Sequence, residues 1–272
     1  MFRQLRTYIE RVKIFAFVIR SRAPPSNVSF GEVIDAAVLL HASSGALHRQ
    51  AHCHSIHMLI DISLPFASHV PVWPGDIPFS CGWTARREDG ASVNLGALTM
   101  SAHAGTHADA PLHVESSWRA SESLPADVFV GPVHVIALPT DLASNAVITR
   151  ELVVALLALR HTDVVVPMRV LCRTNQSVSH DAFPDAWPTL SEDAADWLTN
   201  NGLRLWGTDA PSVDARPSKE LPVHHALFSA GAYVLENLAL RDVVPGVYEL
   251  LAQPLAIHGA DAAPVRAMLR MV

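Results

Sequence analysis

The chain has 272 residues, of which 50% are hydrophobic and only 17% charged, so its composition excludes an intrinsically disordered or collagen-like protein. The net charge of −6 at pH 7 offers no basic surface to a phosphate backbone and argues against nucleic acid as a partner. The three cysteines, Cys53, Cys81 and Cys172, are widely separated, so the sequence predicts neither a disulfide framework nor a thiolate zinc site. This cysteine usage favours a cytoplasmic location.

Residues 1–57 differ from the rest of the chain in charge. They hold seven Lys/Arg against three Asp/Glu, a net of +4, whereas residues 58–272 hold 13 against 23, a net of −10. The apolar run Ile14–Ile19 is too short for a secretory signal or a membrane anchor. No other uncharged apolar run in the sequence is long enough to predict a membrane span. We predict that residues 1–57 are an N-terminal extension, disordered or produced by a misassigned start, and that the folded domain begins at Met58.

From Met58 onward, patterns typical of strands and helices alternate. The first strand pattern covers residues 58–64 and leads into a Pro- and Gly-rich loop at residues 71–76. One helix is predicted after a Thr149 cap and a second after a Ser191 cap. Further strand-like runs are Pro132–Leu138, Val164–Cys172, Leu203–Trp206, Ala232–Leu235 and Val247–Ile257. Strands interleaved with helices predict a single α/β domain over residues 58–272.

The most informative segment runs from His103 to His113. It places His103, His107, Asp109 and His113 within eleven residues. Imidazole nitrogen and carboxylate oxygen are ligands that Zn²⁺ and similar ions select, and the lack of nearby cysteine points to a catalytic site that is open to water. The alternative, unrelated surface histidines, suits any one of these residues better than it suits the group.

The spacing of this motif favours a bent strand over a helix. Gly105 and Pro111 disfavour a continuous helix, whereas an extended chain places His107 and Asp109 on one face. A turn at residues 104–105 would bring His103 to the same side. His113 lies beyond Pro111 and need not be a ligand.

A second group of polar residues lies late in the chain. Glu236 stands within an apolar stretch, where an unpaired carboxylate is costly, so it either meets a cation or faces solvent on an edge strand. His224 offers a second ligand, and His225 is interpreted as its non-ligating neighbour. The segment Trp206–Asp214 precedes them and adds two further carboxylates.

These motifs resemble the bacterial kynurenine formamidase (arylformamidase) branch of the cyclase-like metal-dependent hydrolases. The pattern H-x-G-T-H-x-D-x-P-x-H is met in full by residues 103–113. The resemblance extends from about Leu59 to the C-terminus and includes Trp73-Pro-Gly-Asp76, the Thr208–Asp214 segment, His224-His225 and Leu235-Glu236. It implies a swivelling β/β/α fold, with a mixed sheet or partial barrel and flanking helices, and a homodimer.

The resemblance also implies roles for individual residues. One Zn²⁺ would be held by His103, His107 and Asp109, and a second by Asp109, His224 and Glu236, with Mn²⁺ or another divalent ion as the alternative. His113 would be the proton donor and acceptor. Trp73 would line the substrate pocket, although a core or interface role for this tryptophan is open on the residues alone.

The implied reaction is the hydrolysis of N-formyl-L-kynurenine to L-kynurenine and formate, a step of tryptophan degradation by the kynurenine pathway. A zinc-bound hydroxide would attack the formyl carbon, and His113 would protonate the departing aniline nitrogen. Two alternatives remain at this point: a cyclase-like amidohydrolase of the isatin hydrolase type, and a non-catalytic metal-binding homologue. Neither a nucleic acid nor a membrane partner is expected.

Overall fold

The computed structural model describes residues 59–159, 165–178 and 182–272, so the prediction for residues 1–57 lies outside the described residues. The described chain has mixed α/β structure. The α-helices are α3 (Arg150–Ala158), α4 (Glu192–Asn200) and α5 (Pro222–Ser229). The strands are β1 (Leu59–Asp61), β2 (Ser80–Ala85), β3 (Leu95–Thr99), β4 (His107–Asp109), β5 (Val130–Ala137), β6 (Val147–Ile148), β7 (Arg169–Arg173), β8 (Thr189–Leu190), β9 (Leu205–Thr208), β10 (Tyr233–Glu236), β11 (Gly246–Leu251), β12 (Ala262–Pro264) and β13 (Met268–Met271).

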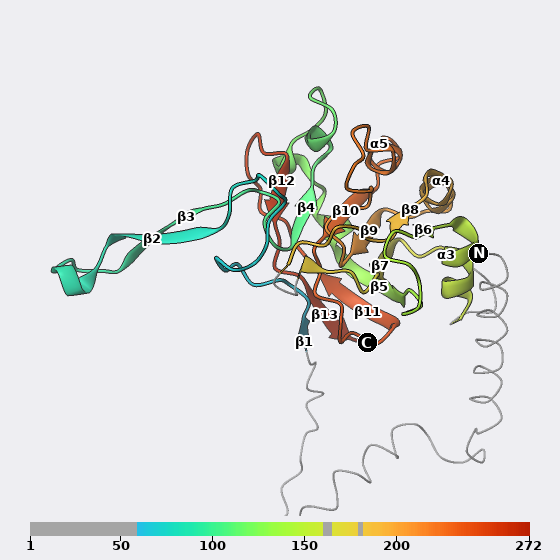
Figure 1. The fold of residues 1–272 in the computed structure, drawn as a ribbon, viewed down its shortest axis with the longest axis horizontal. Coiled ribbons are helices and arrows are strands. Elements are labelled where there is room, and N and C mark those ends of the chain that lie inside the picture. The colour runs from blue at the N-terminus through green and yellow to red at the C-terminus, as the bar shows by residue number, and fades with distance from the viewer. Residues whose placement is uncertain (1–58, 160–164, 179–181) are drawn as a thin grey trace, which may run out of the picture. The chain divides into compact units, whose positions relative to one another are not determined.

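A nine-stranded mixed sheet organises the domain. Its order is β1-β13-β11-β5-β7-β9-β10-β4-β12 (Figure 1). The four central strands β5, β7, β9 and β10 are parallel, and the strands on both flanks pair antiparallel. This mixed, curled sheet with few helices confirms the predicted fold class.

The central strands are buried because both of their faces are covered. β7 and β9 are almost wholly buried, as expected for parallel strands. Gly207 in β9 is required by close packing, since a Cβ there would lie 2.3 Å from Leu171 Cδ2 and 2.9 Å from Leu238 Cδ1. The three helices lie along one side of the sheet in Figure 1, where α4 packs against both α3 and α5.

Two of the helices were predicted from their caps, and the structure confirms them. The Thr149 side chain accepts a hydrogen bond from the Leu152 amide at the start of α3, and the Ser191 side chain accepts one from the Ala194 amide at the start of α4. The third helix, α5, was not predicted. It begins at Pro222, a residue favoured in the first helical turn, and it is only eight residues long.

The predicted strand at residues 247–257 is too long. β11 ends at Leu251, and Ala252 then donates its amide hydrogen to the Phe129 carbonyl. The apolar residues beyond the strand include Leu255 and Ile257, which are exposed, so the apolar pattern there did not mark a strand. Among the described residues, none of the helices has both the length and the apolar character that crossing a membrane requires.

A separate two-stranded hairpin is formed by β2 and β3. It extends away from the large sheet in Figure 1, and nearly all of its strand residues are exposed. The exposed side chains include Trp83, Leu95 and Leu98. The hairpin therefore buries little surface by itself, and an isolated hairpin of this kind is only marginally stable in water.

Candidate metal centre

The candidate site is built on two paired strands, β4 and β10. β4 carries His107 and Asp109, whose side chains share one face because residues two apart on a strand point the same way. β10 runs antiparallel to β4, and its register places Glu236 directly opposite His107. Directly opposed residues present their side chains on one face of the pair. Strand pairing therefore gathers two carboxylates and an imidazole at one place.

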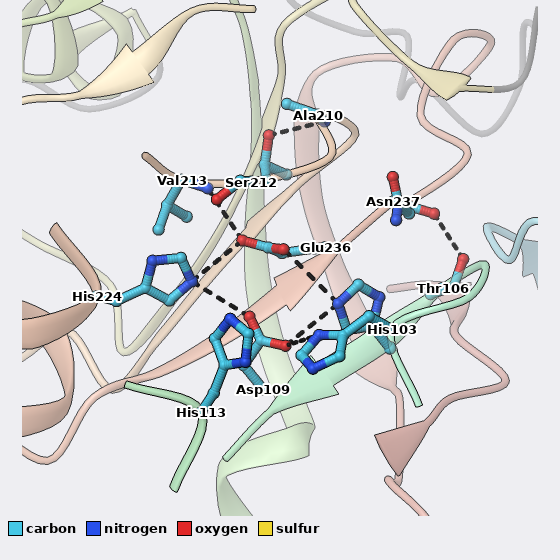
Figure 2. A network of polar contacts seen from close by, with 12 residues as sticks. His103, Thr106, Asp109, His113, Ala210, Ser212, Val213, His224, Glu236 and Asn237 are labelled. Carbon is cyan, nitrogen blue, oxygen red and sulfur yellow. Dashed lines mark hydrogen bonds and ion pairs between the residues drawn. The ribbon is translucent and has the colours of Figure 1, made fainter. Parts of the chain in front are cut away.

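The helix α5 brings His224 to the same place. Asp214 fixes the start of this helix, because its two carboxylate oxygens accept the amide hydrogens of Val223 and His224, each at 3.1 Å. The His224 Nδ1 donates to Asp214 Oδ2 at 2.7 Å. Its Nε2 therefore faces Asp109 Oδ2 at 3.2 Å and Glu236 Oε1 at 3.4 Å (Figure 2).

A tight turn brings His103 back to the cluster, as the sequence predicted. Gly105 adopts a left-handed φ of 63°, which few other residues tolerate. The Gly105 carbonyl accepts a hydrogen bond from His107 Nδ1 at 2.9 Å, which leaves His107 Nε2 on the side of the carboxylates. His103 Nδ1 lies 3.0 Å from Asp109 Oδ1.

Thr106 ties the two strands together beside this turn. Its hydroxyl donates to the Asn237 carbonyl at 2.6 Å and accepts the Leu64 amide hydrogen at 2.8 Å. Asn237 follows Glu236 directly and has a positive φ of 55°. Thr106 thus holds β4 against the end of β10. This contact stabilises the strand register that places the polar side chains of the site together.

Two buried polar atoms at the centre of the cluster have no hydrogen-bond partner. These are His107 Nε2 and Asp109 Oδ1, which lie 3.2 Å apart without hydrogen-bond geometry. Buried polar atoms are almost always satisfied, so an orphaned nitrogen and oxygen that face each other indicate a missing partner. A cation that accepts lone pairs from both atoms satisfies them together.

The structure brings all five predicted ligands together. His103, His107 and Asp109 form one group whose ligand atoms lie within 4.8 Å of one another, and Asp109, His224 and Glu236 form a second. Asp109 belongs to both groups. Nitrogen and oxygen donors in groups of three fit divalent ions that keep open positions for water or substrate.

The charges around Asp109 also call for a cation. Burial would raise the pKa of Asp109, but the imidazoles of His107, His103 and His224 outweigh it and hold that pKa well below its usual value. Burial likewise lowers the pKa of His103, yet Asp109 and Asp261 raise it to about 10. The pKa of His224 is also raised, against burial, by its carboxylate partners. Divalent ions would replace these protons, since metal binding at such sites releases them.

His113 lies beside the cluster and outside the two groups that share Asp109. It ends the 3-10 turn η3 (Pro111–His113), which follows β4. Its ring centre is 4.3 Å from that of His103 and 5.8 Å from that of His224. His113 Nδ1 lies 3.4 Å from Asp261 Oδ2. A third group, His103, His113 and Asp261, also has its ligand atoms within 4.8 Å of one another.

Trp73 belongs to an aromatic cluster linked to this site. Its ring packs edge-on against Phe183 at 5.3 Å and Trp187 at 5.8 Å. The Trp187 indole donates to the carbonyl of Asp214, the residue that orients His224. Trp73 is 39% exposed, so part of the residue is accessible.

Sequence reasoning missed Asp261, because nothing beside it in the sequence marks it. It precedes β12, which pairs with β4 in the register Ala262 to Asp109. His225 is in none of the three groups of candidate ligands among the described residues, and its ring packs against Trp118 at 5.5 Å.

Comparison with known proteins places the chain in a family. The family described as "Putative cyclase" matches residues 60–215, so the chain belongs to the cyclase family. The relatives that it resembles include kynurenine formamidases. That of Salinibacter ruber is 48% identical over 214 residues, which cover 78% of this chain and 97% of the relative. That of Bacillus cereus is 41% identical over 213 residues, with the same coverage. The resemblance stated from the motifs is thereby confirmed.

Solved structures agree with this assignment. One titled as a potential metal-dependent hydrolase with cyclase activity has a TM-score of 0.65 and 32% identity, and the match covers 79% of this chain and 98% of that one. Isatin hydrolase A from Labrenzia aggregata has a TM-score of 0.69 and 26% identity, with coverage of 79% and 93%.

Proposed function

We propose that this chain is an arylformamidase that hydrolyses N-formyl-L-kynurenine to L-kynurenine and formate, as a step of tryptophan degradation. The main observation behind the proposal is that two groups of three candidate ligands share Asp109, with His113 beside them. The chain that carries this arrangement is 41–48% identical to kynurenine formamidases.

The site is proposed to hold two Zn²⁺ ions in each subunit. His103, His107 and Asp109 would hold one, and Asp109, His224 and Glu236 the other. Bound there, the ions would lower the pKa of a bound water molecule and polarise the carbonyl oxygen of the substrate. The orphaned atoms of His107 and Asp109 support this assignment on structural grounds.

His113 is proposed to move the proton that the reaction requires. Hydrolysis of the formyl amide releases an aniline nitrogen, which leaves poorly unless it is protonated. Imidazole is suited to this task because its pKa lies near neutral pH. His113 Nδ1 faces Asp261, so Nε2 is the nitrogen left to exchange a proton with the substrate.

Trp73 is proposed to bind the aryl ring of the substrate. A flat indole covers an aniline ring that carries an ortho acyl group. Its edge contacts with Phe183 and Trp187 hold the ring in one orientation while part of it stays exposed.

Opening of a cyclic aryl amide is the second candidate function. The structural likeness to isatin hydrolase A favours it, with a TM-score of 0.69. Sequence identity is lower there, 26% against 48% for the formamidase of Salinibacter ruber. The formamidase function is therefore the better supported of the two. The identity to kynurenine formamidases also favours it over a non-catalytic metal-binding homologue.

We further propose that the protein is a cytoplasmic homodimer. The apolar side chains of the β2–β3 hairpin are exposed, and Leu98 is 64% exposed. This exposed apolar surface supports an interface with a second copy of the chain. The described cysteines are unpaired, in keeping with a reducing compartment. Sedimentation of the native chain and of Leu98→Lys tests the dimer: the native chain should sediment as a dimer and the variant as a monomer.

Side-by-side kinetics test the substrate assignment. Zinc-loaded protein should hydrolyse N-formyl-L-kynurenine with a much higher kcat/KM than isatin. A preference for isatin would assign the chain to the second candidate. Binding of zinc without turnover of either compound would instead favour the non-catalytic homologue.

A further inference from the structure

Asp261 contacts two histidines of the site through a single oxygen. Its Oδ2 lies 3.0 Å from His103 Nε2 and 3.4 Å from His113 Nδ1. His103 is one of the proposed metal ligands, whereas His113 is the proposed proton carrier. One carboxylate thus contacts both the metal-binding part of the site and the part that moves protons.

The backbone holds Asp261 firmly in this place. β12 pairs antiparallel with β4, and its register puts Ala262 opposite Asp109. The Asp261 carbonyl accepts the Ala110 amide hydrogen at 2.9 Å, just beyond the end of β4. The carboxylate is therefore positioned by the same strand that carries His107 and Asp109.

The other two histidines of the cluster show what such a partner does. His107 Nδ1 donates to the Gly105 carbonyl, and His224 Nδ1 donates to Asp214, so in each ring the Nε2 lone pair faces the carboxylates. A hydrogen-bond acceptor on one nitrogen fixes the proton there and leaves the other nitrogen free.

The same rule applied to Asp261 gives both remaining histidines a defined form. A proton on His103 Nε2 leaves Nδ1 as its ligand atom, and Nδ1 is the nitrogen that lies 3.0 Å from Asp109 Oδ1. A proton on His113 Nδ1 leaves Nε2 free toward the substrate. We propose that Asp261 is a positioning residue that fixes the tautomer and ring orientation of His103 and His113 together and is not itself a metal ligand.

This inference rests on the proposed function, and its test uses zinc-loaded Asp261→Ala, Asp261→Asn and Asp261→Glu. The matched control is Glu122→Gln. Glu122 also pairs with a histidine, His258 at 3.0 Å, and accepts the Gly259 amide hydrogen, but it lies outside all three ligand groups.

Four quantities are measured: bound zinc, kcat and KM for N-formyl-L-kynurenine, and the ¹⁵N shifts of the imidazole nitrogens. We expect zinc content and KM to stay at their native values in Asp261→Ala while kcat falls about 10–100-fold, the usual effect of removing such a hydrogen-bond partner. Asp261→Asn should lose less, Asp261→Glu should recover part of kcat, and Glu122→Gln should match the native chain.

The ¹⁵N spectrum separates positioning from a general structural role. The native spectrum should show the His113 proton on Nδ1, with the resonance assigned by its loss in His113→Ala, and Asp261→Ala should move part of that population to Nε2. An unchanged tautomer in Asp261→Ala would overturn the proposal. Loss of zinc in both Asp261→Ala and Asp261→Asn, with native zinc in Asp261→Glu, would also overturn it, since the carboxylate would then be a ligand.

The tautomer and zinc measurements do not depend on turnover. If native zinc-loaded protein fails to hydrolyse N-formyl-L-kynurenine, the proposed function fails, while the same samples still decide the role of Asp261.

Discussion

The two halves of the site differ in their access to water. The buried half consists of Asp109, His224 and Glu236, whose side chains are 1–5% exposed. The open half consists of His103, His113 and Asp261, whose side chains are 21–47% exposed. The open half holds the proposed proton carrier, His113, which must meet the substrate, together with one proposed metal ligand, His103. The buried half holds proposed ligands only.

The buried half is held in place on every side. Glu236 Oε1 accepts the Val213 amide hydrogen at 2.9 Å, and Asp214 fixes His224. Burying two carboxylates is costly unless positive charge accompanies them. Divalent ions would supply that charge, so we expect the buried half to depend on metal more strongly than the open half does.

The largest expected effect comes from Asp109, a member of the buried half that also contacts His103 of the open half. Asp109→Ala removes a ligand from both metal groups and should abolish metal binding and activity together. Metal analysis of the purified variant, alongside turnover, measures both losses. Chelation of the native protein should have the same effect on activity, and added zinc should restore it.

Asp242→Ala is the control for this change, because Asp242 is an exposed carboxylate that belongs to neither metal group. It should keep native metal content and activity. Full activity in demonstrably metal-free native protein would contradict the metal-dependent mechanism.

The next effect should separate the two halves. His113→Ala changes only the open half, so bound zinc should stay at the native level while kcat falls about 10²–10⁴-fold, as expected for loss of a general acid or base. Metal content and kcat are measured on the same preparation. If zinc disappeared with activity, His113 would be a ligand and the division of tasks would be wrong.

A smaller effect is expected at the edge of the site, where the substrate ring is proposed to bind. Trp73→Ala should weaken kcat/KM for N-formyl-L-kynurenine by about 1 kcal/mol, or roughly fivefold, through lost stacking. Trp197→Ala is the matched control. Trp197 lies on α4, and its ring packs against the side chain of Arg150 on α3. Equal losses in the two variants would show that Trp73 contributes only stability.

The residues of both halves except Asp261 were candidates from the sequence. The spacing of residues 103–113 indicated ligands and a turn at residues 104–105, where Gly105 has a φ of 63°. Glu236 was noticed because a carboxylate in an apolar strand needs a partner. The caps of α3 and α4 were visible for a similar reason, since local chemistry determines them.

Features that depend on distant pairing were not predictable from the sequence. Asp261 reaches His113 across 148 residues only because β12 pairs with β4. The helix α5 is short, and its start is fixed by Asp214, which lies outside it. The convergence of Asp109, His224 and Glu236 was implied by the family resemblance, since spacing alone does not bring segments so far apart together.

The smallest expected effect concerns residues 1–57, which should contribute to neither half. The domain is built from Leu59 onward: β1 pairs with β13, Ile62 is fully buried, and the Ser63 hydroxyl exchanges hydrogen bonds with Ala267. A protein that begins at Met58 should therefore keep native melting temperature, zinc content and kcat/KM.

A second truncation makes this expectation specific. A protein that begins at Leu64 loses β1 and the buried Ile62 side chain, and removal of a large buried aliphatic side chain costs about 2–5 kcal/mol. Thermal unfolding should therefore distinguish the two truncations. If the protein that begins at Met58 were insoluble or inactive, residues 1–57 would be part of the working enzyme, and the site could not be described from residues 59–272 alone.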